Sequence, residues 1–145
     1  MKQLIIYAAI VICAISCTCA KETTGQTTSL YDTRWLLKKI YTDEKEELIN
    51  TKAFIRFDKE KGSAGGNGSC NSFGSTATIN GNEMSFKNIF STKMYCEEVQ
   101  PIENKFLGGL DKVTRYEIKD KKLMLYNNRE LMMEFSASEE KKSTE

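Results

Sequence analysis

The feature that most constrains the fold is a series of short segments in which apolar and polar residues alternate, each ending at a turn signal. In residues 53–57 every second side chain is apolar, the pattern of a strand with one buried face. The dipeptide Asn80-Gly81 is the strongest short signal for a β-hairpin. Such segments predict about seven strands. They are residues 35–41, 53–57, 75–79, 83–87, 114–119, 122–126 and 131–135.

One segment departs from this alternation. Apolar residues recur between residues 97 and 113 at spacings of four, four and three, which predicts an amphipathic helix. A single helix among about seven strands predicts a mainly β fold, a small antiparallel barrel-like sheet with the helix at one end. The recurring residues are Ile102, Phe106, Leu110 and Val113.

The N-terminus has the pattern of an exported protein. Residues 4–15 are nearly all apolar, which suits a signal peptide and is too short to span a bilayer comfortably. Residues 14–17 resemble the lipobox of bacterial lipoproteins, so we expect cleavage before Cys17 and acyl chains, including palmitate, on this residue. Two alternatives stay open: cleavage after Ala20, which gives a soluble secreted protein, and an uncleaved short anchor.

These patterns divide the chain into four parts. Residues 1–16 are the expected signal peptide, and residues 17–29 are the lipidated N-terminus and a flexible Thr-rich tether. Residues 30–135 form one folded domain, and the polar residues 136–145 are expected to be a disordered tail. We therefore expect the protein in the cell envelope, lipid-anchored to a membrane and facing the periplasm or the exterior.

Composition narrows the function. The chain has no histidine, which removes the commonest general base and a favoured zinc ligand. Once the leader with Lys2 is removed, 20 basic residues balance 20 acidic ones, so nucleic acid is not an expected partner. No nucleophile–base pair is evident, and the helix acids Glu97, Glu98 and Glu103 are expected to be solvated. We expect no catalytic residue, no cofactor and no metal site.

Cys70 and Cys96 are the two cysteines of the expected domain. In an exported protein such a pair predicts one disulfide. The two lie 26 positions apart, unlike the short Cys-x-x-Cys spacing of redox couples, so a structural bridge is favoured over a redox function. The glycine-rich residues 65–68 just before Cys70 indicate positive φ or close backbone packing. A phosphate-binding loop is not indicated there, because no Lys-Ser or Lys-Thr pair follows.

Four motifs, in order and at sensible spacings, resemble the META domain family, which includes HslJ-like envelope proteins of bacteria. The family usually has glycine where Ser69 stands. The resemblance covers residues 30–135 and implies a compact antiparallel β-barrel-like fold with one helix, without implying an activity. The motifs are Trp35-x-Leu37, Ser69-Cys70-Asn71, Thr92-x-Met94-x-Cys96 and Glu103-x-x-Phe106-x-x-x-Leu110.

We therefore expect a membrane-anchored, non-enzymatic envelope lipoprotein that serves as a binding or accessory module in envelope stress or homeostasis. Its partner would be an unknown protein or a small apolar ligand, and Met124, Tyr126 and Met132 are candidates for an apolar binding patch. The alternative is an inhibitor of exported proteases, for which residues 62–69 would have to form an exposed rigid loop.

Overall fold

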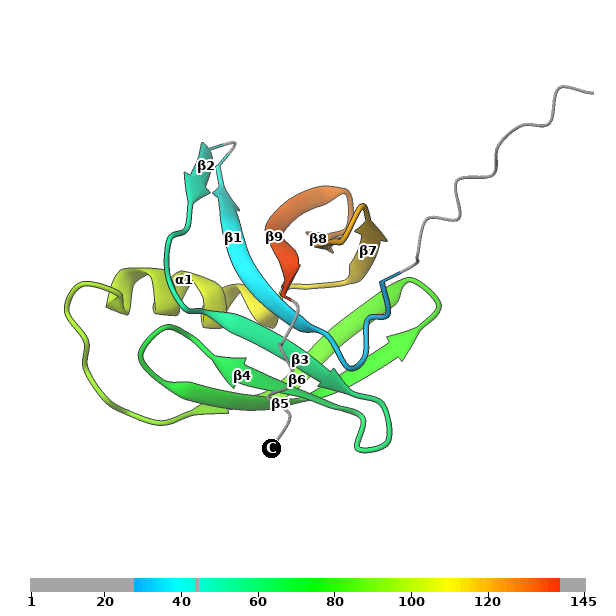
Figure 1. The fold of residues 1–145 in the computed structure, drawn as a ribbon, viewed down its shortest axis with the longest axis horizontal. Coiled ribbons are helices and arrows are strands. Elements are labelled where there is room, and N and C mark those ends of the chain that lie inside the picture. Colours follow the sequence, from blue (N-terminus) through cyan, green and yellow to red (C-terminus); the bar gives the residue numbers. More distant parts are fainter. Residues whose placement is uncertain (1–27, 44, 139–145) are drawn as a thin grey trace, which may run out of the picture.

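The computed structural model describes residues 28–43 and 45–138, which form one antiparallel sheet of nine strands and one helix (Figure 1). The mainly β prediction with a single helix is confirmed, with two strands more than expected. Cys17, the leader and most of the tether lie outside the described residues. No helix within the described ranges is long and apolar enough to cross a membrane. The elements are β1 (Arg34–Thr42), β2 (Lys45–Leu48), β3 (Phe54–Asp58), β4 (Ser63–Asn67), β5 (Ser72–Asn80), β6 (Glu83–Ser91), α1 (Gln100–Leu110), β7 (Arg115–Lys119), β8 (Lys122–Asn127) and β9 (Glu130–Ser138).

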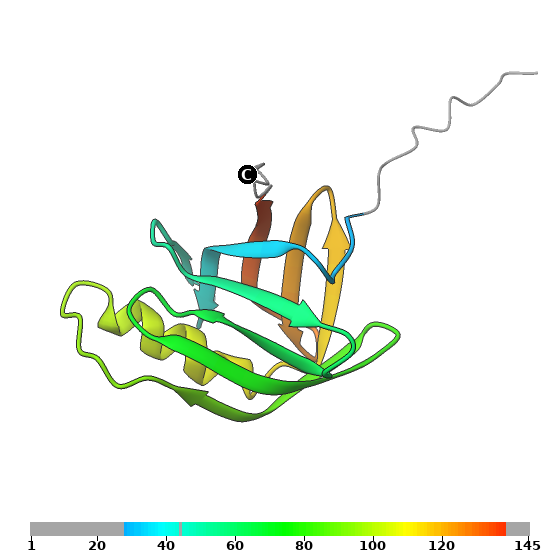
Figure 2. The same ribbon diagram turned by 60° about the horizontal axis from the view of Figure 1, so that its bottom comes forward.

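The sheet closes into a ring because its first long strand meets its last one. The strand order is β2-β1-β3-β4-β5-β6-β7-β8-β9, and β1 also pairs antiparallel with β9. The shortest pairing is that between β6 and β7, where only Glu83 and Arg115 are register partners. Helix α1 lies across one end of the ring (Figure 2), so the predicted barrel-like arrangement is confirmed.

The two strands absent from the prediction carry no alternating apolar signal. Strand β2 is short, and most of its side chains are exposed. Strand β4 has the sequence Ser-Ala-Gly-Gly-Asn. A Cβ atom on Gly66 would collide with the carbonyl oxygen of Phe54 in β3, so the glycines permit close backbone packing, one of the two options that the sequence indicated. The exposed loop expected at residues 62–69 is wrong, because β4 pairs with β3 on one side and β5 on the other.

Two β-bulges change which side chains face the core. In β1 the extra residue is Lys38, so that Ile40, rather than Lys39, is buried at 2% exposure. In β6 two residues, Asn88 and Ile89, lie opposite the single residue Ser75 of β5, and Asn88 has a φ of 53°. A bulge shifts the alternation of a strand by one position. Phe90 therefore points outward, although the alternation of the preceding residues would bury it.

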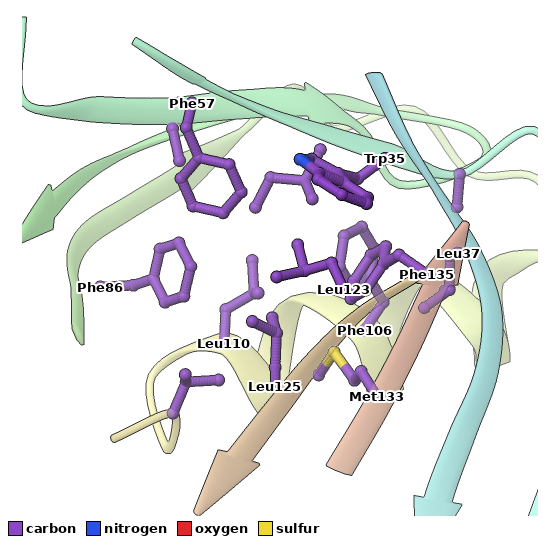
Figure 3. Close-up of a cluster of buried hydrophobic side chains, with 14 of the residues drawn as sticks. Trp35, Leu37, Phe57, Phe86, Phe106, Leu110, Leu123, Leu125, Met133 and Phe135 are labelled. Atoms are coloured by element: carbon purple, nitrogen blue, oxygen red, sulfur yellow. The ribbon is translucent and has the colours of Figure 1, made fainter. Parts of the chain in front are cut away.

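The core lies inside the ring, between the strands and α1 (Figure 3). Phe106 of α1 is fully buried and lies edge-on to Phe73, with ring centroids 5.4 Å apart, and 5.9 Å from the ring of Phe135 in β9. The Trp35 side chain is also fully buried, and its indole N–H donates to the carbonyl of Leu30 at 3.0 Å. Aromatic packing of this kind supplies much of the stability of a small domain.

The end of the domain differs from the prediction. Strand β9 runs to Ser138, and Ala137 pairs with Trp35 of β1. Residues 136–138 therefore belong to the sheet, and the expected disordered tail was placed too early, because a polar sequence alone does not reveal pairing with β1. Residues 139–145 lie outside the described part of the chain.

Candidate functional site

The corner between β4 and β5, residues 68–71, has a backbone that few side chains tolerate. Ser69 adopts a φ of 110°, a region that favours glycine. A Cβ on Gly68 would lie 2.6 Å from the Oε2 atom of Glu103, so the absence of a side chain lets this carboxylate approach. The buried hydroxyl of Ser69 has no hydrogen-bond partner among the described residues.

Glu103 of α1 is 2% exposed and reaches into this corner. Its Oε2 atom accepts hydrogen bonds from the backbone N–H groups of Cys70, at 3.0 Å, and Asn71, at 2.7 Å. Its Oε1 atom accepts one from the Asn71 side chain at 2.5 Å. The expectation that Glu103 is solvated is wrong. Its partners Cys70 and Asn71 lie more than 30 positions away in the chain, so helical periodicity could not reveal them.

These hydrogen bonds keep Glu103 ionised. Burial raises the pKa of its carboxyl, but the donated bonds from Asn71, Cys70 and Gln100 outweigh burial and lower the pKa below its ordinary value of 4.5. A carboxylate of this kind does not exchange protons near neutral pH. It fixes the corner to the helix instead.

The side-chain amide of Asn71 holds the next segment in turn. Its Oδ1 atom accepts from the Met94 N–H at 2.8 Å and from the Thr92 hydroxyl at 2.7 Å. Its Nδ2 group donates to the Met94 carbonyl at 2.9 Å as well as to Glu103. All four hydrogen-bonding positions of the amide are thus used. Thr92 bonds to Asn71 and does not cap α1, whose N-cap is Val99.

Cys70 and Cys96 form a disulfide with Cα atoms 5.9 Å apart. Residues 92–96, called the clamped segment below, are therefore held at three points. Thr92 N–H donates to the Ser72 carbonyl at 3.0 Å, Met94 is held by Asn71, and Cys96 is held by the disulfide. This segment follows β6, has no regular secondary structure and contains no residue with positive φ.

Although its backbone is fixed, the clamped segment exposes large apolar side chains. Met94 is 59% exposed and Tyr95 is 77% exposed, and Phe90 just before the segment is 70% exposed. In both ribbon views the connection from β6 to α1 lies at one end of the domain, and the first described residues lie at the other (Figures 1 and 2). Phe90, Met94 and Tyr95 are called the apolar face below.

The apolar patch expected from the sequence lies elsewhere and is less exposed. Met132 packs against the core, which removes it from the patch. Tyr126 and Met124 are half-buried, and the Arg115 guanidinium lies over the Tyr126 ring at 3.8 Å. Sequence reasoning missed the apolar face because an alternating pattern continued through residue 90 would bury Phe90, and because residues 92–96 have no periodicity. The sequence feature that marked residues 92–96 was the motif Thr92-x-Met94-x-Cys96.

Two of the hollows on the surface of the described part bear on ligand binding. A wide open depression of about 1730 Å³ is lined mainly by charged and small polar residues, among them Asp32, Asp58 and Lys59. A smaller hollow of about 280 Å³ lies between β1, α1 and β9, above Met132 and Met133. Pockets for small ligands are typically apolar and of about 300–1,000 Å³, so the wide depression is too large and too polar for that class, and the smaller hollow lies at the lower end of its size range. No three His, Cys, Asp or Glu side chains of the described residues lie close enough to hold a metal ion.

The domain is a ring of antiparallel strands closed over one helix, and a disulfide joins its glycine-rich corner to the segment before the helix. This arrangement defines a class of small disulfide-bonded β domains. The sequence model of the META domain matches residues 28–140. The chain belongs to the META domain family, as its motifs indicated.

Two NMR structures share this fold at low sequence identity. The NMR structure of a protein from Burkholderia xenovorans has a TM-score of 0.65 at 19% identity, covering 77% of this chain and 85% of that one. A second NMR structure has a TM-score of 0.54 at 17% identity, covering 72% and 87%. The crystal structure of a DUF4847 family protein from Bacteroides vulgatus has a TM-score of 0.48 at 17% identity, covering 60% of each chain. No curated protein matches the sequence significantly.

Proposed function

We propose that this protein is a non-enzymatic lipoprotein of the cell envelope whose META domain binds a partner protein through the apolar face. The observation that carries the proposal is the exposure of Phe90, Met94 and Tyr95 beside a backbone held at three points. All three side chains fall within residues 90–95, and exposed apolar side chains that cluster in this way favour an interaction surface in a soluble domain. Tyrosine is among the residues that dominate binding energy at such surfaces.

The fixed backbone favours binding because less conformational entropy is lost on association. Met94 is held through both its N–H and its C=O group, so its neighbours begin in one conformation. A segment that served only to connect β6 to α1 would not need this support. The rigidity is therefore consistent with recognition of a shaped partner surface.

The position of the face fits a protein anchored at its N-terminus. The leader favours a lipid on Cys17, which would place the domain on a membrane and facing the periplasm or the exterior. The connection from β6 to α1, which carries Met94 and Tyr95, lies at the end of the domain away from the first described residues (Figure 1). A tether to the membrane would therefore leave it accessible to partners, in processes such as envelope stress or homeostasis.

The chemistry of the buried groups supports a function without catalysis. Among the described residues, Glu103 is the buried carboxylate. Its oxygens are occupied by donors and its pKa is lowered, so it is poorly suited to acid–base catalysis. We propose a binding module rather than an enzyme.

The alternative, an inhibitor of exported proteases, has no support from residues 62–69, which comprise the whole of β4 and the residues that flank it. It gains support from the clamped segment, which is exposed, rigid and fixed by a disulfide at its end. An inhibitor is one kind of partner-binding module, so the two candidates share their site.

The binding proposal is tested by affinity capture from native membranes with the anchored protein as bait. A variant with Phe90→Ser, Met94→Ser and Tyr95→Ser should lose at least about 10-fold of the captured partner. Leu48→Ser is the matched control, because Leu48 is 74% exposed but lies on β2. A partner retained equally by both variants would contradict the proposal.

The anchor is tested separately. Cys17→Ala should move the protein from the membrane fraction to the soluble fraction, and mass spectrometry of the purified protein should find acyl chains on Cys17 only in the wild type. A soluble wild-type protein that begins after Ala20 would support the secreted alternative instead.

A further inference from the structure

We propose that the clamped segment is an inhibitory loop that enters the substrate cleft of an exported endopeptidase, with Tyr95 in the primary specificity pocket of the enzyme. The inference rests on the proposed binding function and names the class of partner.

Some backbone groups of the clamped segment are hydrogen-bonded to the domain, and others are not. Both polar backbone groups of Met94 bond to Asn71. No hydrogen bond of the Lys93 or Tyr95 backbone groups exists within the described residues. Thr92, Met94 and Cys96 are the residues attached to the domain, and attachment at every second residue is the pattern of an extended chain. In such a chain, neighbouring residues present their N–H and C=O groups in opposite directions. If Met94 faces the domain, Lys93 and Tyr95 therefore offer their backbone groups to an incoming protein.

An alternating row of free backbone groups is what an endopeptidase cleft recognises in an extended peptide. Peptides bound in this way add a strand to the partner, with affinity from backbone hydrogen bonds and specificity from side-chain pockets. The clamped segment has no residue with positive φ, so no left-handed turn interrupts it. A flat protein surface or a bilayer would use the apolar side chains but would leave these backbone groups unpaired.

The attachments lie on both sides of Tyr95. Met94 before it is held by Asn71, and Cys96 after it is held by the disulfide to Cys70. Hydrolysis of the Tyr95–Cys96 bond adds one water molecule and gives a carboxylate on Tyr95 and an amine on Cys96. Both new ends would stay attached to the same corner. Cleavage would therefore release neither fragment, and the segment would behave as a tight, slowly cleaved ligand.

The side chain at the centre sets the enzyme class. Tyr95 is the most exposed of the large apolar side chains of the described residues, at 77%. Its ring suits the deep apolar pocket of endopeptidases that cleave after aromatic or bulky apolar residues. Met94 and Phe90 would contact the rim of the cleft.

In the test, the full mature protein in detergent is added to chymotrypsin, subtilisin and trypsin, and inhibition of each enzyme is measured. The same measurement is made on the proteases that the native cells export. We expect inhibition of the enzymes that accept aromatic residues and little inhibition of trypsin. Tyr95→Arg should weaken chymotrypsin inhibition at least about 100-fold and create inhibition of trypsin. A gain of trypsin inhibition would not follow from mere loss of structure, and Leu48→Ser should inhibit like the wild type.

Three outcomes would overturn the inference. The first is the absence of inhibition of every enzyme in the panel by the folded wild type. The second is inhibition that is unchanged in Tyr95→Arg. The third is binding of lipid vesicles, or self-association into a dimer, that requires Tyr95. The binding proposal itself fails only if the triple serine variant captures its partner as well as the wild type does, so the two failures are distinguishable.

Discussion

The core of the ring and the corner at residues 68–71 are both buried, but they are held by different forces. Around Phe106 the contacts are aromatic and aliphatic, and they depend on volume. At the corner, Glu103 and Asn71 make directed hydrogen bonds in which each donor needs its own acceptor. The core should therefore tolerate changes that keep its volume, whereas the corner should not tolerate even an isosteric change that reverses a donor and an acceptor.

The largest effect is expected in the core. Phe106→Ala should lower the free energy of unfolding by about 3–5 kcal/mol, because it leaves a cavity between Phe73 and Phe135. Phe106→Leu keeps much of the volume and should cost less than about half as much. Chemical denaturation measures both. Equal losses for Leu and Ala would mean that ring geometry, rather than volume, stabilises the core.

Removal of the disulfide should have the next largest effect. The variant with Cys70→Ser and Cys96→Ser opens a loop of 26 positions and should lose about 3–4 kcal/mol by loop-closure entropy. Because Asn71 and Glu103 still hold the corner, we expect the circular dichroism spectrum to stay that of the wild type. An unfolded double variant would show that the hydrogen bonds at the corner cannot act without the covalent bridge.

The isosteric change Glu103→Gln tests the corner directly. One oxygen is replaced by an NH₂ group that faces N–H donors, so we expect a loss of about 2–3 kcal/mol at pH 7. The matched control Glu98→Gln, on an exposed residue, should change stability by less than about 0.5 kcal/mol.

The same carboxylate should make stability depend on pH. The folded-state pKa of Glu103 lies below its ordinary value of 4.5, so the unfolded chain takes up the proton first as the pH falls. The stabilisation is complete above about pH 4.5 and is lost as the pH falls through the folded-state pKa. The free energy of unfolding, measured by chemical denaturation at several pH values between 7 and 3, should therefore depend less on pH in Glu103→Gln than in the wild type. An equal dependence on pH in the two proteins would show that Glu103 is not its origin.

The smallest effect should be a gain. Ser69→Gly removes a side chain at φ 110° and a buried hydroxyl without a hydrogen-bond partner. We expect about 1 kcal/mol of added stability, because glycine adopts this conformation without strain. Thermal unfolding should show the gain as a higher melting temperature. A lower melting temperature would mean that the added chain entropy of glycine in the unfolded state outweighs the relief of backbone strain.

The contrast between the core and the corner also explains which parts of the fold the sequence predicts. Alternation located the strands around Trp35, Ile55 and Leu123 because burial on one face follows a fixed period. The predicted strands 114–119 and 122–126 also placed the connection at Asp120-Lys121, and both residues have positive φ there. The bulges at Lys38 and Asn88 were not, because one extra residue in a strand leaves no compositional mark.

The corner was predicted only in part. The glycines and the cysteine pair indicated close packing and a bridge, but the partner of Glu103 lies 32 residues away at Asn71. Local patterns describe a residue by its neighbours in the chain, and an acid on a helix is solvated by default. Burial of Glu103 depends on a backbone shape at Gly68 and Ser69 that only the assembled sheet produces.

The pairing of β1 with β9 also governs when the domain can form. A chain made from its N-terminus cannot complete the ring until residues near Ser138, the end of β9, have left the ribosome. Contacts between the first and last strands raise the contact order, and folding slows accordingly. Until then β1 lacks its partner strand and the ring stays open, and an open chain can still be threaded through a narrow translocation channel.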